Sequence, residues 1–213
     1  MKISTIENID FNSISTIIFD WGGVITNIHP AATVDAFSKL GHHSLNKYLK
    51  TDQSDDLFLR FEMGKASEEE IYEQLRTDIG RYIQTEKLHD ALCAMLLDTP
   101  EIRLNILEKL GKKFKLLLLS NTNPVHTRYY NNYLREQHSV DFHAFFQKVY
   151  YSYELGMRKP DPEIFKFVLA DNKLDGHKTL FIDDTEINTQ VARSLNIQSL
   201  YLNERMTLES IFL

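Results

Sequence analysis

Residues 15–27, STIIFDWGGVITN, decide the fold of this 213-residue chain. A run of apolar, mostly β-branched residues stops at Asp20, and Trp21, Gly22 and Gly23 follow at once. A continuous apolar run of this kind is typical of a parallel strand that is buried on both faces. Asp20 therefore stands at the carboxyl end of a buried strand, where an open α/β sheet binds its ligands.

Four further segments predict strands of the same sheet, and helical patterns separate them. Two are strongly apolar and end at Ser120 and Asp183, a third leads into Lys159, and the fourth closes the chain. In chain order the segments are 115–119, 148–155, 179–182 and 199–202. The alternation of strand and helix predicts an α/β fold with a doubly wound parallel sheet, in which these polar residues share one edge.

Residues 28–100 interrupt this alternation. They are rich in charged residues and helix formers, and they contain no convincing strand. Ser67 and Glu70 have the spacing of a capping box at the start of an apolar-periodic helix. We therefore predict a core domain formed by residues 1–27 and 101–213, with a helical cap of residues 28–100 that stands over the strand ends as a lid.

Composition excludes several classes of protein. The formal net charge of −6 argues against a nucleic-acid partner, because binding phosphates nonspecifically needs a basic face. No apolar run reaches the length of a membrane span, and residues 1–13 lack the apolar core of a signal peptide. Cys93 is the only cysteine, so no intrachain disulfide can form and a reducing cytoplasm is the simplest location. The oligomeric state is left open.

The residues at the strand ends have the chemistry of phosphoryl transfer. Asp20 can attack phosphorus in line and form an aspartyl-phosphate. Mg²⁺ prefers hard oxygen ligands, which the carboxylates of Asp20, Asp183 and Asp184 and the backbone carbonyl of Gly22 can supply. We expect Asp184 to bind the ion directly and Asp183 to act through water or a hydrogen bond. The opposite assignment stays open.

The transferred phosphate also needs fixed donors. The Ser120 hydroxyl, the Asn121 backbone N–H and the Lys159 ammonium group can provide them at neighbouring strand ends. Trp21, beside the nucleophile, either lines the pocket for the leaving group or packs against the hinge of the lid. The substrate expected from this set is a small phosphorylated metabolite.

Four segments carrying these residues resemble the motifs of the haloacid dehalogenase superfamily of hydrolases. They are IIFDWGGVI, LLLLSNTN, LGMRKPDPEIF and LFIDDTEIN, in that order along the chain. The resemblance implies a Rossmann-like core, an inserted helical cap, a Mg²⁺-dependent phosphatase activity and the roles given above. The first motif and SNTNPVH are similar to a subgroup that includes bacterial phosphatases of sugar phosphates, such as α-glucose 1-phosphate.

Gly22 departs from the superfamily pattern. Most phosphatases of the superfamily carry an aspartate there, which protonates the leaving group and then activates water. Losing such a group without replacement forfeits about 10²–10⁴-fold in rate. Water, His29 or Glu62 could take its place, or the leaving group could be a sugar oxygen that needs a proton less urgently.

Two other functions remain open. The chain could be a regulatory protein that binds a phosphorylated ligand without turning it over, which Gly22 motivates. A dehalogenase ranks last, because that chemistry needs no metal and leaves Asp183 and Asp184 unexplained.

Several residues keep two interpretations at this stage. His126 either contacts the substrate or stabilises the helix that follows the second motif. Asn123 is expected to cap that helix, and Asn188 to hydrogen-bond the loop of the metal ligands. Phe61, with Trp21, His29 and Glu62, is a candidate for selecting the leaving group.

Overall fold

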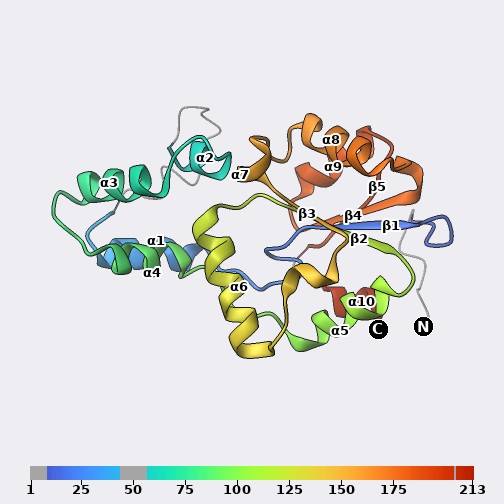
Figure 1. Cartoon of the computed structure of the whole chain (residues 1–213), viewed down its shortest axis with the longest axis horizontal. Helices are drawn as coiled ribbons and strands as arrows, with labels where there is room; N and C mark the ends of the chain where they lie inside the picture. The colour runs from blue at the N-terminus through green and yellow to red at the C-terminus, as the bar shows by residue number, and fades with distance from the viewer. Residues whose placement is uncertain (1–8, 44–56, 204) are drawn as a thin grey trace.

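The structure is a computed structural model that describes residues 9–43, 57–203 and 205–213. Two lobes lie side by side along the longest axis (Figure 1). One is built on a sheet, and the elements described in the other are helices. The expectations for residues 1–8, and for the part of the cap between residues 44 and 56, lie outside the described residues.

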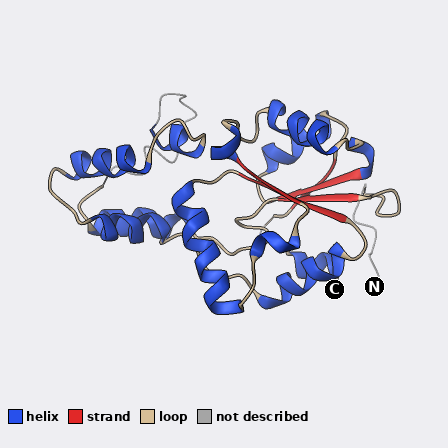
Figure 2. Cartoon of the chain, in the orientation of Figure 1, coloured by secondary structure: helices blue, strands red, loops and turns tan. Residues whose placement is uncertain are grey.

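The first lobe contains a five-stranded parallel sheet in the order β3-β2-β1-β4-β5, with helices on both sides (Figure 2). The strands are β1 (Thr16–Phe19), β2 (Lys115–Ser120), β3 (Lys148–Tyr151), β4 (Thr179–Asp183) and β5 (Gln198–Tyr201). The first strand, β1, lies in the middle of the sheet. β2 and β3 follow on one side of it, and β4 and β5 on the other. This confirms the doubly wound α/β fold.

Successive residues of the central strands point to opposite faces of the sheet. Ile17 and Phe19 of β1 belong to the hydrophobic cluster under one helical layer, and Ile18 belongs to the cluster under the other. Because both faces are covered, the strands read as continuous apolar runs. The first layer contains α5 (Glu101–Gly111), α6 (Pro124–His138) and α10 (Leu208–Phe212), and the second contains α8 (Pro162–Asn172) and α9 (Glu186–Ser194).

Two strand predictions were too long or incomplete. The segment 148–155 is a strand only to Tyr151, and Ser152–Leu155 forms the short helix α7, which ends at Gly156 with φ 66°. The Ser152 hydroxyl bonds both the N–H and the carbonyl of Thr122, which draws the chain out of the sheet. The chain also continues beyond β5 into α10, which begins with a capping box of Thr207 and Ser210. The 3₁₀ helices Phe142–Phe145 and Gly176–Lys178 also lie in the described part of this lobe.

The second lobe consists of helices between β1 and α5. They are α1 (Pro30–Lys39), α2 (Leu57–Glu62), α3 (Glu68–Ile79) and α4 (Thr85–Cys93). The predicted capping box at the start of α3 is present, with the Ser67 side chain bonded to Glu70 N and the Glu70 side chain to Ser67 N. Phe61 and Cys93 lie in the hydrophobic cluster of this lobe. Burial raises the pKa of the Cys93 thiol to about 12, which suits a packed side chain and not a nucleophile.

The two connections between the lobes pair with each other. Asn27 N donates to Asp98 O, Leu97 N donates to Asn27 O, and His29 N donates to Met95 O, at 2.8–3.0 Å. The side chain of Arg103 on α5 is buried and donates to the carbonyls of Val24 and Ile25 and to the Asn27 amide oxygen. The start of the connection is therefore held in place from the core side.

A second contact joins the lobes at α2 and α7. Arg158 Nη2 lies 3.2 Å from Glu62 Oε2. Gly64, with φ 65°, follows α2, and a Cβ atom added there would lie 2.1 Å from the backbone oxygen of Tyr153 in α7. Only glycine permits this approach of the two backbones.

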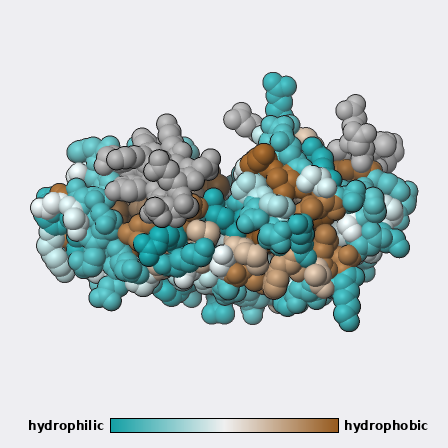
Figure 3. All heavy atoms as spheres, turned by 90° about the horizontal axis from the view of Figure 1, so that it is seen from above, coloured by the Kyte–Doolittle hydropathy of each residue, from teal (hydrophilic) through white to brown (hydrophobic). Residues whose placement is uncertain are grey.

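Most of the visible surface is hydrophilic, and hydrophobic residues reach it mainly on the lobe that contains the sheet (Figure 3). The large exposed side chains there include Phe167 of α8 and Ile187 of α9. Within residues 9–43, 57–203 and 205–213, no helix combines the length and the hydropathy that a membrane span requires.

Replacing Gly64 with alanine tests the contact between α2 and α7. Gly80→Ala is the matched control, because Gly80 has φ 74° and open space around its Cβ position. Both variants should lose about 1 kcal/mol of unfolding free energy to the left-handed backbone conformation. Gly64→Ala should lose at least about 1 kcal/mol more, since two backbones must separate. Urea unfolding gives both values, and equal losses would contradict the close contact.

Candidate active site

The carboxyl ends of β1 and β4 place three carboxylates together. Asp20 N donates to Ile182 O at 2.9 Å, which continues the pairing of the two strands and sets Asp20 beside Asp183. One oxygen from each of Asp20, Asp183 and Asp184 lies within 4.8 Å of the others. The carboxyl ends of β1 and β4, between which the strand order reverses, therefore carry three carboxylates close together.

Lys159 lies between two of these carboxylates. Its Nζ is 2.8 Å from Asp20 Oδ1 and 2.7 Å from Asp183 Oδ2, and the residue is 1% exposed. Burial lowers the pKa of Lys159, but the Asp183 and Asp20 carboxylates outweigh this effect and raise it overall. The ammonium group therefore stays charged in the interior.

The Asn121 side chain fixes the backbone of Lys159. Its Nδ2 donates to Lys159 O at 2.8 Å, and its Oδ1 accepts from Lys159 N at 2.9 Å. The sequence had assigned Asn121 only a backbone N–H for phosphate and missed this role of the side chain. A side-chain amide followed much later by a lysine carries no spacing signal, because the pairing depends on the meeting of β2 with the loop before α8.

Asp183 and Asp184 differ in their surroundings. Asp183 is fully buried and accepts from Thr185 N at 2.7 Å, from the Asn188 amide at 3.0 and 3.1 Å and from Lys159 at 2.7 Å. The hydrogen bond expected from Asn188 is therefore present. The contact described for Asp184 is a long one, 3.4 Å from the Thr185 hydroxyl. Asp184 thus has more free carboxylate oxygen to offer.

Gly22 and Gly23, which follow Trp21, differ in what a side chain would meet at each position. Gly23 has φ 75°, and a Cβ there would lie 1.9 Å from Asp184 Oδ2, so the carboxylate sits directly against the backbone. At Gly22 a Cβ would meet two atoms of the Ile28 side chain at 3.3 Å. The Ile28 side chain therefore packs against Gly22, where the resemblance described above implies an aspartate in most relatives.

Burial, the largest cause, raises the pKa of Asp20 to about 7. Lys159 opposes this rise, and the charges of Asp183 and Asp184 add to it. Burial and Asp183 also raise the pKa of Asp184. One ammonium group does not balance three carboxylates, and this excess of hard oxygen ligands fits a divalent cation such as Mg²⁺.

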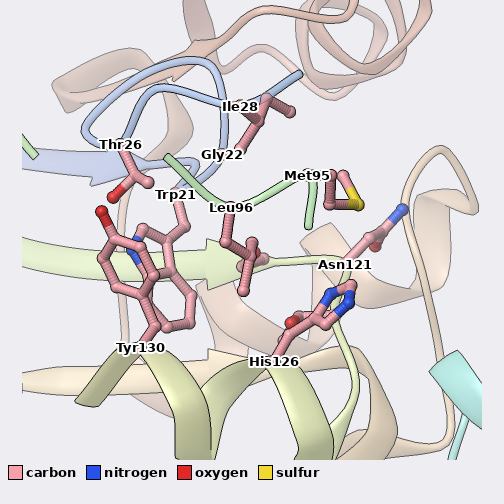
Figure 4. Close-up of a pocket in the computed structure, with 11 residues that line it drawn as sticks. Trp21, Gly22, Thr26, Ile28, Met95, Leu96, Asn121, His126 and Tyr130 are labelled. Carbon is pink, nitrogen blue, oxygen red and sulfur yellow. The ribbon is translucent and has the colours of Figure 1, made fainter. Parts of the chain in front are cut away.

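A cavity of about 80 Å³ lies between Gly22 and the end of β2, and Figure 4 shows residues that line it. Its lining residues come from the loop after β1, the returning connection, the end of β2 and α6. They are Trp21, Gly22, Thr26, Ile28, Met95, Leu96, Ser120, Asn121, Thr122, His126 and Tyr130. The sequence did not single out Ile28, Met95 or Leu96, because apolar residues of a connection carry no chemical signal.

Two other residues singled out from the sequence, Trp21 and Asn123, lie at or next to the cavity. Trp21 lines the cavity and also packs on the rings of Tyr130, Phe142 and Tyr151. Asn123 caps α6, with Oδ1 accepting from His126 N, as expected.

The candidates in and near the cap are not brought into the cavity. His29 is exposed at the start of α1, and Phe61 lies inside the hydrophobic cluster of the second lobe. Glu62 pairs with Arg158 instead of lining the cavity.

Comparison with known proteins matches residues 14–196 to the family model described as haloacid dehalogenase-like hydrolase. A D-ribitol-5-phosphate phosphatase of Bacteroides thetaiotaomicron is 32% identical over 87% of this chain and 90% of its own length. A sesquiterpene phosphatase of Aspergillus oryzae is 28% identical over 89% of this chain and 90% of its own length.

Solved structures give the same picture. The crystal structure of a haloacid dehalogenase family enzyme from B. thetaiotaomicron, in complex with magnesium and inorganic phosphate, superposes with a TM-score of 0.87. It is 32% identical, and the alignment covers 94% of this chain and all of that one. The residues matched by the family model, 14–196, include every residue of the site described above.

Asn in place of Asp20 should stabilise the metal-free protein above neutral pH. The unfolded chain releases this proton near pH 4 and the folded protein near pH 7. Stability from this group is therefore complete below about pH 4 and is lost as the pH rises through 7. Melting temperatures in EDTA from pH 5 to 8 should fall less for Asp20→Asn than for the wild type. The exposed Asp35→Asn should follow the wild type, and identical slopes for all three would contradict the crowding of charge at Asp20.

Proposed function

The chain belongs to the haloacid dehalogenase-like hydrolase family, and from this premise we propose that it is a Mg²⁺-dependent phosphatase. Its proposed substrate is a small phosphorylated metabolite, namely a sugar phosphate or the phosphate of a sugar alcohol. The observation that carries the proposal is Lys159 bonded between Asp20 and Asp183, with Asp184 beside them. A charged nucleophile and a set of cation ligands share one strand edge.

Asp20 is the proposed nucleophile. Lys159 is bonded to Oδ1, which leaves Oδ2 free to attack the phosphorus atom of the ester. The Oδ2–P bond forms as the bond from phosphorus to the ester oxygen breaks, and the leaving oxygen keeps the electron pair. Water then attacks the phosphorus of the aspartyl-phosphate, which restores the Asp20 carboxylate and releases inorganic phosphate.

Asp20, Asp184 and the carbonyl of Gly22 are proposed to hold Mg²⁺, with Asp183 supporting from behind. A bound Mg²⁺ supplies positive charge that offsets the charge of the phosphate. The hydrogen bonds that engage both oxygens of Asp183 argue for this order. Ser120 and the Asn121 N–H are proposed to hold the phosphate oxygens, with Lys159.

The leaving oxygen takes its proton from water in this proposal. Gly22 offers no acid, and none of the described residues that line the cavity carries a carboxyl group. Trp21 and the connection residues cover the leaving group, so the lobe of residues 28–100 is proposed to act as the cap of a core made by residues 1–27 and 101–213.

The regulatory alternative rests on Gly22, which lacks the usual acid and at which an added Cβ would press on the Ile28 side chain at 3.3 Å. A dehalogenase would leave the two further carboxylates of the cluster without a task. We propose a cytoplasmic location and no nucleic-acid partner, because the chain carries a net charge of −6 and a single cysteine.

The activity is tested by measuring phosphate release from D-ribitol 5-phosphate, other sugar phosphates and nucleotides. Release should require Mg²⁺ and stop in EDTA. Asp20→Asn should stay folded and lose at least about three orders of magnitude in kcat, and the exposed Asp35→Asn should keep the wild-type rate. Binding of phosphorylated compounds without release from any of them would favour the regulatory protein.

The metal assignment is tested by calorimetric titration with Mg²⁺. Asp184→Asn should weaken Mg²⁺ binding more than Asp183→Asn does, because it removes a direct ligand. Asp183→Asn should cost more unfolding free energy, about 3 kcal/mol, because the buried Lys159 loses a charged partner. The reverse order of Mg²⁺ affinities would exchange the two roles.

A further inference from the structure

His126 stands in the first turn of α6 and contributes to the wall of the cavity next to Asn121 and Met95 (Figure 4). α6 follows directly from the strand end that carries Ser120 and Asn121. The imidazole therefore lines the cavity close to the strand end that carries Ser120 and Asn121. The proposed chemistry of the site gives it no role.

The hydrogen bond of His126 to the second lobe determines which nitrogen carries the proton. Nε2 lies 3.1 Å from the backbone oxygen of Leu92 in α4. A carbonyl oxygen only accepts, so Nε2 must be the donor. In the neutral ring Nδ1 then carries a lone pair, and no group among the described residues donates to it.

The ring is neutral at physiological pH. Burial lowers the pKa of His126 to about 4, and the Leu92 carbonyl opposes this only in part. His126 is thus no replacement for the acid missing at Gly22, because it has no proton to give at Nδ1.

The rest of the cavity makes an acceptor there selective. Trp21, Ile28, Met95 and Leu96 form an apolar part of its wall, which also contains Thr26, Thr122 and Tyr130. The volume of about 80 Å³ is near half that of an engineered cavity of roughly 150 Å³ that takes up benzene. The cavity therefore encloses only the few atoms of a leaving group that lie next to the ester oxygen.

We propose that His126 Nδ1 accepts a hydrogen bond from a hydroxyl group of the leaving group and so selects small polyhydroxylated phosphate esters over alkyl esters. This inference rests on the proposed phosphatase function and specifies its substrate class. An alkyl chain at the same place would bury the lone pair without a donor, and leaving a buried acceptor unsatisfied is costly.

Two variants separate the two nitrogens of the ring. In His126→Gln the longer amide can still donate to Leu92 O, near the position of Nε2, but no acceptor remains at the position of Nδ1. In His126→Asn the amide oxygen lies near the position of Nδ1, and the bond to Leu92 is lost. The first variant removes the proposed contact, and the second removes only the contact between lobes.

The experiment compares kcat/KM for D-ribitol 5-phosphate and pentyl phosphate, two esters with the same number of carbon atoms. The wild type should prefer ribitol 5-phosphate, and His126→Gln should reduce this preference roughly tenfold to a hundredfold. His126→Asn should keep the preference within about threefold of the wild type. p-Nitrophenyl phosphate, which has no hydroxyl group, should be hydrolysed by all three proteins at similar rates.

The other outcomes are distinct from one another. An unchanged preference in His126→Gln, or equal losses on all three esters, would overturn the inference while the phosphatase function stands. A wild type that prefers pentyl phosphate would do the same. Absence of phosphate release from every ester by the wild type would overturn the proposed function itself.

Discussion

A single buried ammonium group holds the candidate site together. Lys159 bonds the carboxylates that end β1 and β4, and the Asn121 side chain from the end of β2 clamps its backbone on both sides. Three neighbouring strand ends thus meet at one cation. A buried lysine is stable only with such partners, because taking its charge out of water costs several kcal/mol. The loop before α8 is fixed by the same requirement.

The single positive charge of Lys159 does not balance the negative charges of Asp20, Asp183 and Asp184. Three carboxylates lie close to it, and burial together with the charges of Asp183 and Asp184 raises the pKa of Asp20 to about 7. The glycine at position 23 lets Asp184 approach the backbone and tightens the group further. Such crowding destabilises the protein without a metal ion and favours binding of a divalent cation. The metal-free protein is therefore less stable because of the same carboxylates that are proposed to bind the cation.

The two lobes share the first turn of α6. Val125 is fully buried within the hydrophobic cluster of the helical lobe, although its helix covers the sheet. The next residue, His126, bonds to Leu92 of α4 and lines the cavity. The phosphate side of the site and the helical lobe are therefore joined through one helix start. Ile28 and Leu96, from the paired connections, complete the wall beside Gly22.

The sequence by itself determined the parallel sheet and the polar residues at its strand ends. These features follow from local pattern, because continuous apolar runs between helical segments admit few folds, and the polar residue after each run must lie at the sheet edge. The placement of Asp20, Ser120 and Asp183 at neighbouring strand ends needed no structure. The run at 148–155 was misjudged because a single hydroxyl, that of Ser152, ends the strand through a bond to a distant backbone.

Only the tertiary structure decided which of these groups touch. The clamp by Asn121, the bond from Lys159 to Asp183 and the bond that fixes the proton on His126 all join residues that lie far apart in the chain. The exposed position of His29 and the burial of Phe61 likewise depend on how the helical lobe packs. Hydrogen bonds and burial are set by distances of a few ångströms between segments. A one-dimensional pattern fixes the direction of a side chain within its own element, but not its partner in another.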